Sequence, residues 1–151
     1  MSEAAPAQPA GPVGPVGPVK PAGENHWQAG RRGEDLALAH LEEKGYRLAH
    51  RNYRYGRGEI DLVMEDPQGV LVFVEVKSNR GNGAGRPLQR VDGRKILQIQ
   101  RMAQRYCWEH RQSGRDMRFD VVGVDLGANG GGKLEHVENA FLPSASGYYH
   151  A

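Results

Sequence analysis

The sequence predicts an α/β domain in which helices flank a mixed central sheet, with core elements in the order αβββαβ and one further strand after them. Three observations predict this fold class. Three short apolar runs between residues 46 and 78 are separated by tight turns, which is typical of antiparallel strands. A long amphipathic segment precedes these runs and another follows them. A fourth apolar run comes after the second amphipathic segment.

The expected domain covers residues 25–142, since a chain of 151 residues suits one domain with tails. Residues 1–24 are rich in Ala, Pro and Gly, and their three Gly-Pro-Val repeats are far too few for a collagen triple helix. We therefore expect a disordered arm there and a short tail at residues 143–151. The arm lacks a basic start and a continuous apolar run, so it does not resemble a secretory signal.

The first amphipathic segment predicts a helix over residues 26–44. Asn25 is a favourable N-cap, and Gly45 is a favourable residue just beyond the C-terminus. Helical spacing forms one stripe from Trp27, Gly30, Glu34, Leu38 and Leu41. Glu34 thus lies in an apolar face, where an ionised carboxylate is costly unless it meets a cation or hydrogen-bond donors. The alternative is a slightly rotated helix in which Glu34 makes an ordinary hydrogen bond.

The three apolar runs predict strands over residues 46–54, 59–64 and 70–78. Strict alternation puts successive side chains on opposite faces of a strand. In the second strand it separates Ile60, Leu62 and Met64 from Glu59, Asp61 and Val63. In the third strand one face carries Leu71, Phe73, Glu75 and Lys77.

A loop over residues 79–89 leads to a second helix over residues 93–111, with Asp92 as N-cap and Gly114 as a stop. One side of this helix carries Arg94, Arg101 and Arg105. Lys95 lies at the edge of the apolar sector, so it either reaches the sheet or extends past the core to solvent. Strands over residues 119–125 and 134–141 complete the predicted fold.

The net charge of +2 hides a strong asymmetry. Residues 79–118 contain ten Lys/Arg and three Asp/Glu, a balance of 10 − 3 = +7, which leaves −5 for the rest. Such a basic segment suits an anionic polymer, although a solvated basic surface is the alternative. The single cysteine excludes an intrachain disulfide, and no Cys/His spacing resembles a zinc site. No stretch approaches the roughly 20 apolar residues of a membrane span, so we expect a cytoplasmic protein.

Two charged residues end the most apolar run of the chain, in the segment Glu75-Val76-Lys77. Side chains two residues apart on a strand project from one face, about 6.6 Å apart. Asp61 stands on the preceding strand. An acid on one strand followed by Glu-x-Lys on the next is an arrangement that nucleases use to hold Mg²⁺ and a water at a phosphodiester. The alternative is a surface ion pair at a strand end, which contributes little.

Five short motifs together resemble one family. They are Gly30-Arg31-Arg32-Gly33-Glu34, Gly58-Glu59-Ile60-Asp61-Leu62, Phe73-Val74-Glu75-Val76-Lys77, Lys95, and Arg118-Phe119-Asp120-Val121-Val122. In this order and spacing the chain resembles the YraN-like bacterial family, which is related to the PD-(D/E)XK endonucleases and archaeal Holliday-junction resolvases. The resemblance covers roughly residues 27–141 and implies an αβββαβ nuclease-like core.

The resemblance also implies roles for four residues. Asp61 and Glu75 would ligate a divalent metal, and Lys77 would be the motif lysine. Glu34, the acidic residue of the first helix, would complete the ligand shell of that metal or hold a second ion. Ile60 stands where many related nucleases have proline. The implied cofactor is Mg²⁺ or Mn²⁺, which take oxygen ligands. Related resolvases pair as dimers, so a homodimer is a candidate assembly.

The expected partner is nucleic acid, and no membrane is implied. Basic side chains that could neutralise phosphates without reading bases are Arg80, Arg86, Arg94, Lys95, Arg101 and Arg105. Glu59 is expected to be exposed at a turn, Asp120 to cap a strand end, and the six histidines to have no site role.

The leading hypothesis is a metal-dependent endonuclease that hydrolyses phosphodiester bonds in DNA, with branched or damaged DNA as a candidate substrate. The alternative is a catalytically idle nucleic-acid-binding module on the same fold. A structural or assembly partner is a third hypothesis.

Overall fold

The computed structural model describes residues 26–79, 91–127 and 133–141. Their elements follow in the order α1 (His26–Glu43), β1 (Arg47–Tyr55), β2 (Gly58–Glu65), β3 (Leu71–Asn79), α2 (Gly93–Glu109), β4 (Met117–Asp125) and β5 (Leu134–Val137). The predicted order of αβββαβ with one further strand is confirmed. The predicted arm at residues 1–24 and tail at 143–151 lie outside the described residues, as does almost all of the predicted loop.

The described strands form one mixed sheet with the order β1-β2-β3-β4-β5. β1, β2 and β3 are antiparallel neighbours, as the short turns between them predict. β4 pairs parallel to β3, after the crossover that contains α2, and β5 returns antiparallel to β4. The α/β class and the mixed sheet are therefore confirmed.

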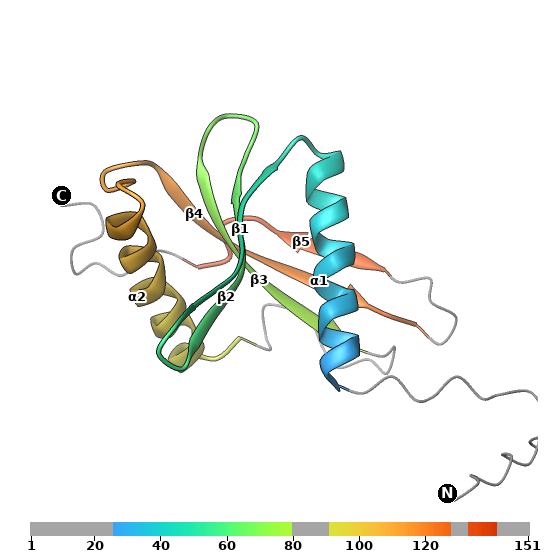
Figure 1. Cartoon of the computed structure of the whole chain (residues 1–151). Coiled ribbons are helices and arrows are strands. Elements are labelled where there is room, and N and C mark those ends of the chain that lie inside the picture. The colour runs from blue at the N-terminus through green and yellow to red at the C-terminus, as the bar shows by residue number, and fades with distance from the viewer. Residues whose placement is uncertain (1–25, 80–90, 128–132, 142–151) are drawn as a thin grey trace, which may run out of the picture.

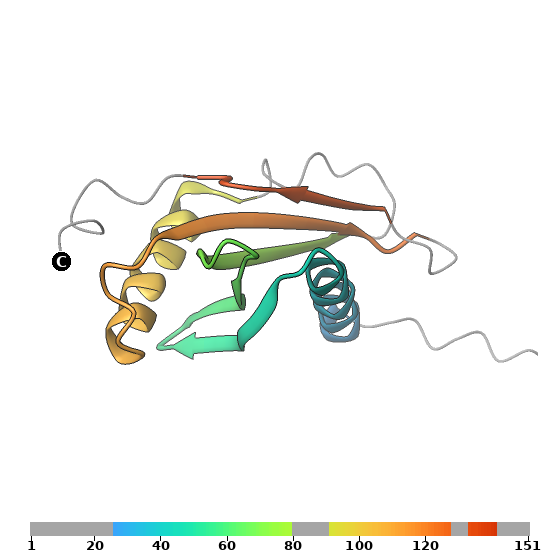
Figure 2. The same cartoon turned by 90° about the horizontal axis from the view of Figure 1, so that it is seen from above.

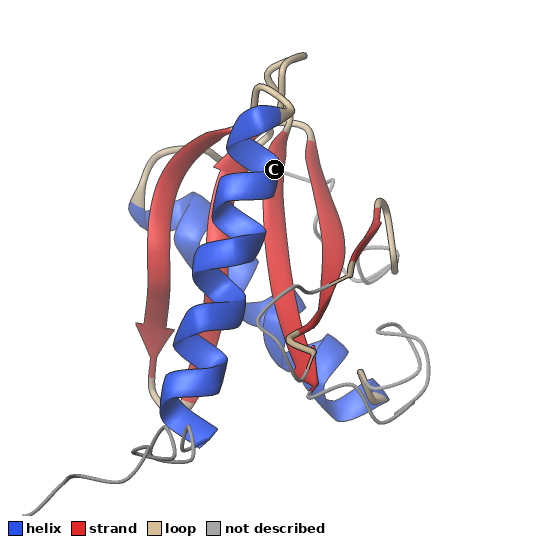
Figure 3. Ribbon diagram, turned by 90° about the vertical axis from the view of Figure 1, so that its right-hand side faces the viewer, coloured by secondary structure: helices blue, strands red, loops and turns tan. Residues whose placement is uncertain are grey.

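The two helices lie on opposite faces of the sheet (Figures 1 and 2). Figure 3 looks onto the face that α1 covers, with α2 behind the strands. The core on the α1 side includes Ala37 and Leu41 of the helix and Leu62, Val74 and Val122 of the sheet. The core on the α2 side has its own apolar set, which includes Ile60, Phe73, Ile99, Tyr106 and Phe119. Each helix buries its apolar stripe against one face of the same sheet.

The prediction that Ile60 shares one face of the sheet with Leu62 and Met64 was wrong. Ile60 packs on the α2 side, whereas Leu62 and Met64 pack on the α1 side. The register of β2 on β3 runs from Glu65↔Leu71 to Leu62↔Val74, while β2 continues to pair with β1 as far as Gly58. A two-stranded ribbon twists more than a strand held on both sides, so alternation within β2 does not carry across this point.

A buried ion cluster centred on Asp120 lies on the α1 side, near the start of β4. Asp120 is fully buried, and its oxygens lie 2.9 Å from Nε of Arg118 and 2.7 Å from Nε2 of His136. Arg118 also donates to Asp66 and to the hydroxyl of Tyr46. Burial raises the pKa of Asp120, but bonds from His136 and Arg118 outweigh it, so the pKa is lowered from its ordinary value. Asp120 does more than cap a strand, and His136 has a structural partner.

The last strand is shorter than predicted, because the chain turns at Asn139, whose φ is 52°. None of the helices in the described part of the chain is both long enough and apolar enough to cross a membrane.

Candidate functional site

Two strands separate at Asp61, and the candidate site lies at this fork. Where the β2–β3 pairing ends, Oδ2 of Asp61 accepts a hydrogen bond of 2.7 Å from the backbone N–H of Val76. The Asp61 carboxylate thereby accepts a backbone N–H of β3 that no longer has a backbone partner on β2. Glu75 precedes Val76, so the fork brings together the acids of two neighbouring strands.

Glu75 is a buried carboxylate with one unsatisfied oxygen. Its side chain is 5% exposed, and Oε1 lies 3.4 Å from Nζ of Lys77 and 3.7 Å from Nζ of Lys95. Oε2 is buried and has no hydrogen-bond partner within the described structure. Buried carboxylate oxygens almost always have a donor or an ion, and the candidates at this oxygen are a proton shared with Asp61 or a cation.

Asp61 and Glu75 titrate together. Burial raises the pKa of Asp61 well above its ordinary value, and the neighbouring charge of Glu75 raises it further. Burial also raises the pKa of Glu75, although Lys95 and Lys77 offset part of this effect. Two carboxyls in one partly desolvated space resist carrying two charges unless a cation joins them.

A second carboxylate group shares Asp61. One oxygen from each of Glu34, Glu59 and Asp61 lies within 4.8 Å of the other two. Asn52 links two of these acids: its Nδ2 donates to Glu34 Oε1 at 3.0 Å and to Glu59 Oε1 at 3.0 Å. Asn52 has a φ of 53°, a left-handed conformation that asparagine tolerates better than most residues. The backbone conformation at Asn52 therefore presents its amide to the acids.

Arginines from β1 balance the outer acids. Arg51 pairs with Asp35 at 2.6 Å and with Glu34 at 3.5 Å, and Arg54 pairs with Glu59 at 3.2 Å. Glu75 instead has the two lysines. Each outer acid therefore has a basic partner: an arginine of β1 for Glu34 and for Glu59, and two lysines for Glu75. Asp61 interacts with both sets of acids.

Close packing of α1 positions Glu34. A side chain at Gly33 would overlap the hydroxyl of Ser78 near the end of β3. The missing Cβ lets α1 approach β3 closely at this point. Glu34, the next residue, is therefore held beside the fork.

The donor set fits a hard divalent cation. All the acids offer carboxylate oxygens, which Mg²⁺ and Mn²⁺ prefer, and Mg²⁺ typically takes only one or two of them. Glu34, Glu59 and Asp61 offer three such oxygens within 4.8 Å of one another. Glu75 is not part of that group, but it interacts with Asp61 through its charge and has a buried oxygen, Oε2.

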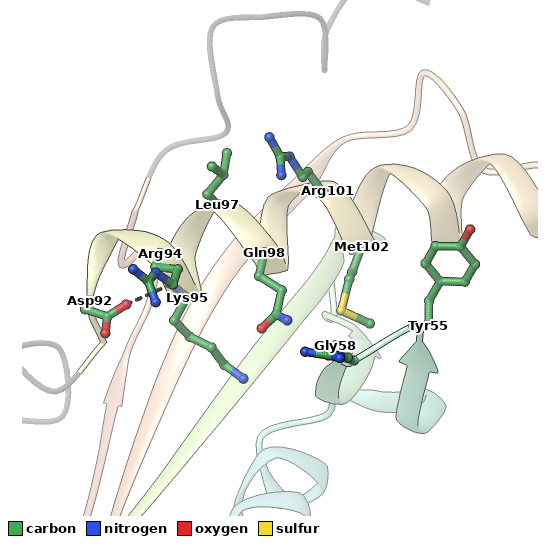
Figure 4. Close-up of a pocket in the computed structure, with 11 residues that line it drawn as sticks. Tyr55, Gly58, Asp92, Arg94, Lys95, Leu97, Gln98, Arg101 and Met102 are labelled. Carbon is green, nitrogen blue, oxygen red and sulfur yellow. Dashed lines mark hydrogen bonds between the residues drawn. The ribbon is translucent and has the colours of Figure 1, made fainter.

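A basic groove of about 630 Å³ lies between α2 and the turn that joins β1 to β2 (Figure 4). Its cations are Arg57, Arg94, Lys95 and Arg101. Gln98 and Met102 point from α2 toward the Gly58 turn, whereas the side chains of Leu97 and Arg101, which also line the groove, point away from that turn (Figure 4). Lys95 joins the groove to the acids, because it lines the groove and also pairs with Glu75.

The sequence-predicted residues divide between these places. Glu34 and Asp61 lie together with Glu59 at the fork, whereas Glu75 is not part of that close group: it pairs with Lys77 and interacts with Asp61 through its charge. Arg94, Lys95 and Arg101 line the groove. Arg105 lies apart: its Nε is 2.7 Å from Glu109 Oε1, although its N–H does not point at the oxygen, and its guanidinium lies over the Tyr55 ring. Arg80 and Arg86 lie outside the described residues.

Glu59 and Asn52 were missed as site residues. Glu59 is partly buried rather than exposed, with 32% of its side chain accessible. Its position two residues before Asp61 on one strand was a usable signal. No sequence signal marked Asn52, because its contribution depends on a left-handed backbone conformation.

The sequence model of the uncharacterised protein family UPF0102 matches residues 33–124. The chain belongs to this family. The resemblance to the YraN-like family is thereby confirmed. The matched span contains all four acids of the fork, both lysines and the described arginines of the groove.

Curated UPF0102 proteins match this chain over most of their own length. A UPF0102 protein of Persephonella marina is 36% identical over 76% of this chain and 94% of its own. One of Corynebacterium efficiens is 43% identical over 70% of this chain and 85% of its own. A solved structure, that of Pyrococcus furiosus SfsA in complex with Ca²⁺, matches 74% of this chain and 61% of its own at 17% identity with a TM-score of 0.29. That likeness is too weak to carry an argument.

Proposed function

We propose that this UPF0102 protein is a metal-dependent endonuclease that hydrolyses phosphodiester bonds in DNA, with branched or damaged DNA as the candidate substrate. The observation that carries the proposal is Glu75. Its carboxylate is buried beside Asp61 and Lys77, and Oε2 lacks a partner. A buried carboxylate is costly without a compensating charge, and a divalent cation would supply one.

Asp61 and Glu75 would hold the ion, which we propose to be Mg²⁺ or Mn²⁺. Glu34 and Glu59 lie close enough to Asp61 to add oxygens or to hold its orientation. When bound, such an ion supplies Lewis-acid polarisation of the phosphate and lowers the pKa of a water.

The lysines act on the substrate's negative charge. Lys77 and Lys95 both approach Glu75 Oε1 and both keep part of their side chain exposed. An ammonium held there stabilises the charge that develops on the phosphoryl oxygens. In the reaction the water oxygen bonds to phosphorus, and the bond between phosphorus and the leaving deoxyribose oxygen breaks. The water gives up a proton, and the leaving oxygen gains one.

The groove supports the nucleic-acid part of the proposal. Arg94, Lys95 and Arg101 line it, and Lys95 also pairs with Glu75 at the fork, so a phosphodiester backbone could run from the groove to the acids. A nuclease that acts on cellular DNA works in the cytoplasm, and the proposal includes that location.

The test is a cleavage panel of linear duplex, single-stranded, flapped and four-way DNA with Mg²⁺ or Mn²⁺. We expect the wild type to cut at least one of these, and Asp61→Asn and Glu75→Gln each to lose 100-fold or more in rate. Asp35→Asn is the matched control, because Asp35 is an exposed acid beside Glu34 that pairs with Arg51. It should retain activity.

A catalytically idle nucleic-acid-binding module is the second candidate, and the basic groove favours it because binding there needs no acids. If the wild type cuts no substrate with either metal but binds DNA, this account replaces the nuclease. Equal loss of activity in Asp35→Asn and Asp61→Asn would also count against the assigned metal site.

A further inference from the structure

Two exposed aromatic rings lie beside the cations of α2. Tyr55 is 52% exposed and lines the groove from the β1 side. Trp108 is 71% exposed near the C-terminal end of α2. Neither ring is used by the metal site, so both are open to a ligand.

Tyr55 is held in place from one side. The Arg105 guanidinium lies 3.8 Å from the centre of the Tyr55 ring. Arg105 is in turn paired with Glu109, one turn along the helix. A ring stacked on a fixed guanidinium has a defined orientation, which suits a platform for a flat ligand.

Trp108 continues a line of cations. Arg94, Arg101 and Trp108 are seven residues apart along α2, and an α-helix drifts only about 20° per seven residues. These three side chains therefore share one side of the helix. From Lys95, at the fork, to Trp108 the helix rises about 20 Å, about the length of six stacked nucleotides of one strand.

We propose that this side of α2 and the β1–β2 turn bind one unpaired strand of nucleic acid, with phosphates on Arg94, Lys95 and Arg101 and bases stacked on Tyr55 and Trp108. The charge of the surface selects a polyanion, because Asp92 is the one acid among the residues that line the groove. The open rings select unpaired bases, since a duplex keeps its base faces stacked internally. The inference rests on the proposed function only in naming the substrate as DNA with a single-stranded flap or tail.

The test measures binding without metal. In a Trp27→Phe background Trp108 is the one remaining tryptophan, so its fluorescence reports on this surface alone. In EDTA, we expect a twelve-nucleotide oligothymidine to quench it and to bind at least tenfold more tightly than a blunt hairpin with as many phosphates. Affinity for the single strand, measured by anisotropy of a labelled oligonucleotide, should fall about tenfold in Trp108→Ala and in Tyr55→Ala. Trp108→Phe and Tyr55→Phe, which keep a ring, should lose much less.

Arg47→Ala is the control for lost charge. Arg47 lies on β1, is 79% exposed at its side chain and pairs with Glu65. It should not alter binding. The proposal is overturned if the hairpin binds as tightly as the single strand, or if the two alanine variants bind like wild type. Because no metal is present, a protein that binds single strands but cuts nothing would refute the nuclease and keep this inference, and a nuclease that binds duplex equally well would do the reverse.

Discussion

A single buried carboxyl pair sets the local energetics of the fork. Asp61 and Glu75 share a space in which burial raises both pKa values. For an acid, a raised pKa in the folded state means that the unfolded chain ionises more readily. The pair therefore supports folding below the ordinary carboxyl pKa of 3.8, and that support is lost as the pH rises through the raised value.

The first prediction concerns this pair. Without metal, Asp61→Asn should raise the thermal midpoint relative to wild type at pH 8, because it removes the need to ionise a buried group. The gain should shrink at pH 4.5, where the wild-type pair is largely protonated. Midpoints measured by circular dichroism in EDTA at both pH values test this.

Metal binding should reverse the order of stability, making the wild type more stable than Asp61→Asn. Excess Mn²⁺ at pH 8 should stabilise the wild type by RT ln(1 + [Mn²⁺]/Kd), as any ligand of the folded state does. It should leave Asp61→Asn nearly unchanged. A wild type that is already more stable than Asp61→Asn at pH 8 in EDTA would contradict the conclusion that the buried Asp61–Glu75 pair resists ionisation.

At the scale of elements, the site depends on how closely α1 approaches β3. Gly30 and Gly33 lie three residues apart in the same helix, yet their surroundings differ. A Cβ at Gly33 would overlap the Ser78 hydroxyl and lie 3.1 Å from the Ser78 Cβ, whereas a Cβ at Gly30 would meet nothing within 4 Å. One glycine is therefore required by packing and the other is not.

The second prediction compares these glycines. Gly33→Ala should cost about 1–3 kcal/mol of unfolding free energy, because the Ser78 hydroxyl can turn away but its Cβ stays too close. Gly30→Ala should gain about 0.5–1 kcal/mol, since alanine favours a helix interior over glycine. Urea unfolding of both variants tests this. Ser78→Gly should restore part of the Gly33→Ala loss, and equal effects at the two positions would show that the contact with β3 is unimportant.

Turn signals and periodicity were enough to predict every described element, because each depends on residues close together in the chain. Asp92 was predicted to cap α2, and its side chain does accept from the N–H of Lys95. The grouping of Asp61, Glu75 and Lys77 could likewise be inferred from two adjacent strands. The spacing of Glu59 and Asp61 on one strand indicated that they share a face, but alternation alone did not predict that β2 stops pairing with β3 beyond Leu62.

Long-range polar contacts were beyond prediction. Asp66, Arg118 and His136 meet at Asp120 from three separate parts of the chain. No periodic pattern encodes such a meeting. Lys95 was left between the sheet and solvent, and only the fold shows that its amine reaches Glu75.

At the scale of the whole molecule, acidic and basic side chains occupy two adjoining regions that meet at Lys95. The fork gathers Glu34, Glu59, Asp61 and Glu75, and α2 presents Arg94 and Arg101 beyond Lys95. Phosphates neutralised by such cations release counterions, so their number appears in the salt dependence of binding. The acids oppose binding until a metal neutralises them.

The third prediction uses this separation. For single-stranded DNA in EDTA, Arg94→Ala and Arg101→Ala should each weaken binding for all sequences and reduce the slope of log K against log salt by about 0.7. Arg105→Ala should change the slope less, because Glu109 already offsets its charge, and should act mainly through loss of support for Tyr55. Asp61→Asn should bind as well as wild type or more tightly, since it removes a negative charge near the phosphates. Anisotropy titrations from low to moderate salt measure the slope for wild type and for each of the four variants. Identical slopes for wild type, Arg94→Ala and Arg101→Ala would show that these arginines are ordinary solvated surface and that the route for nucleic acid lies elsewhere.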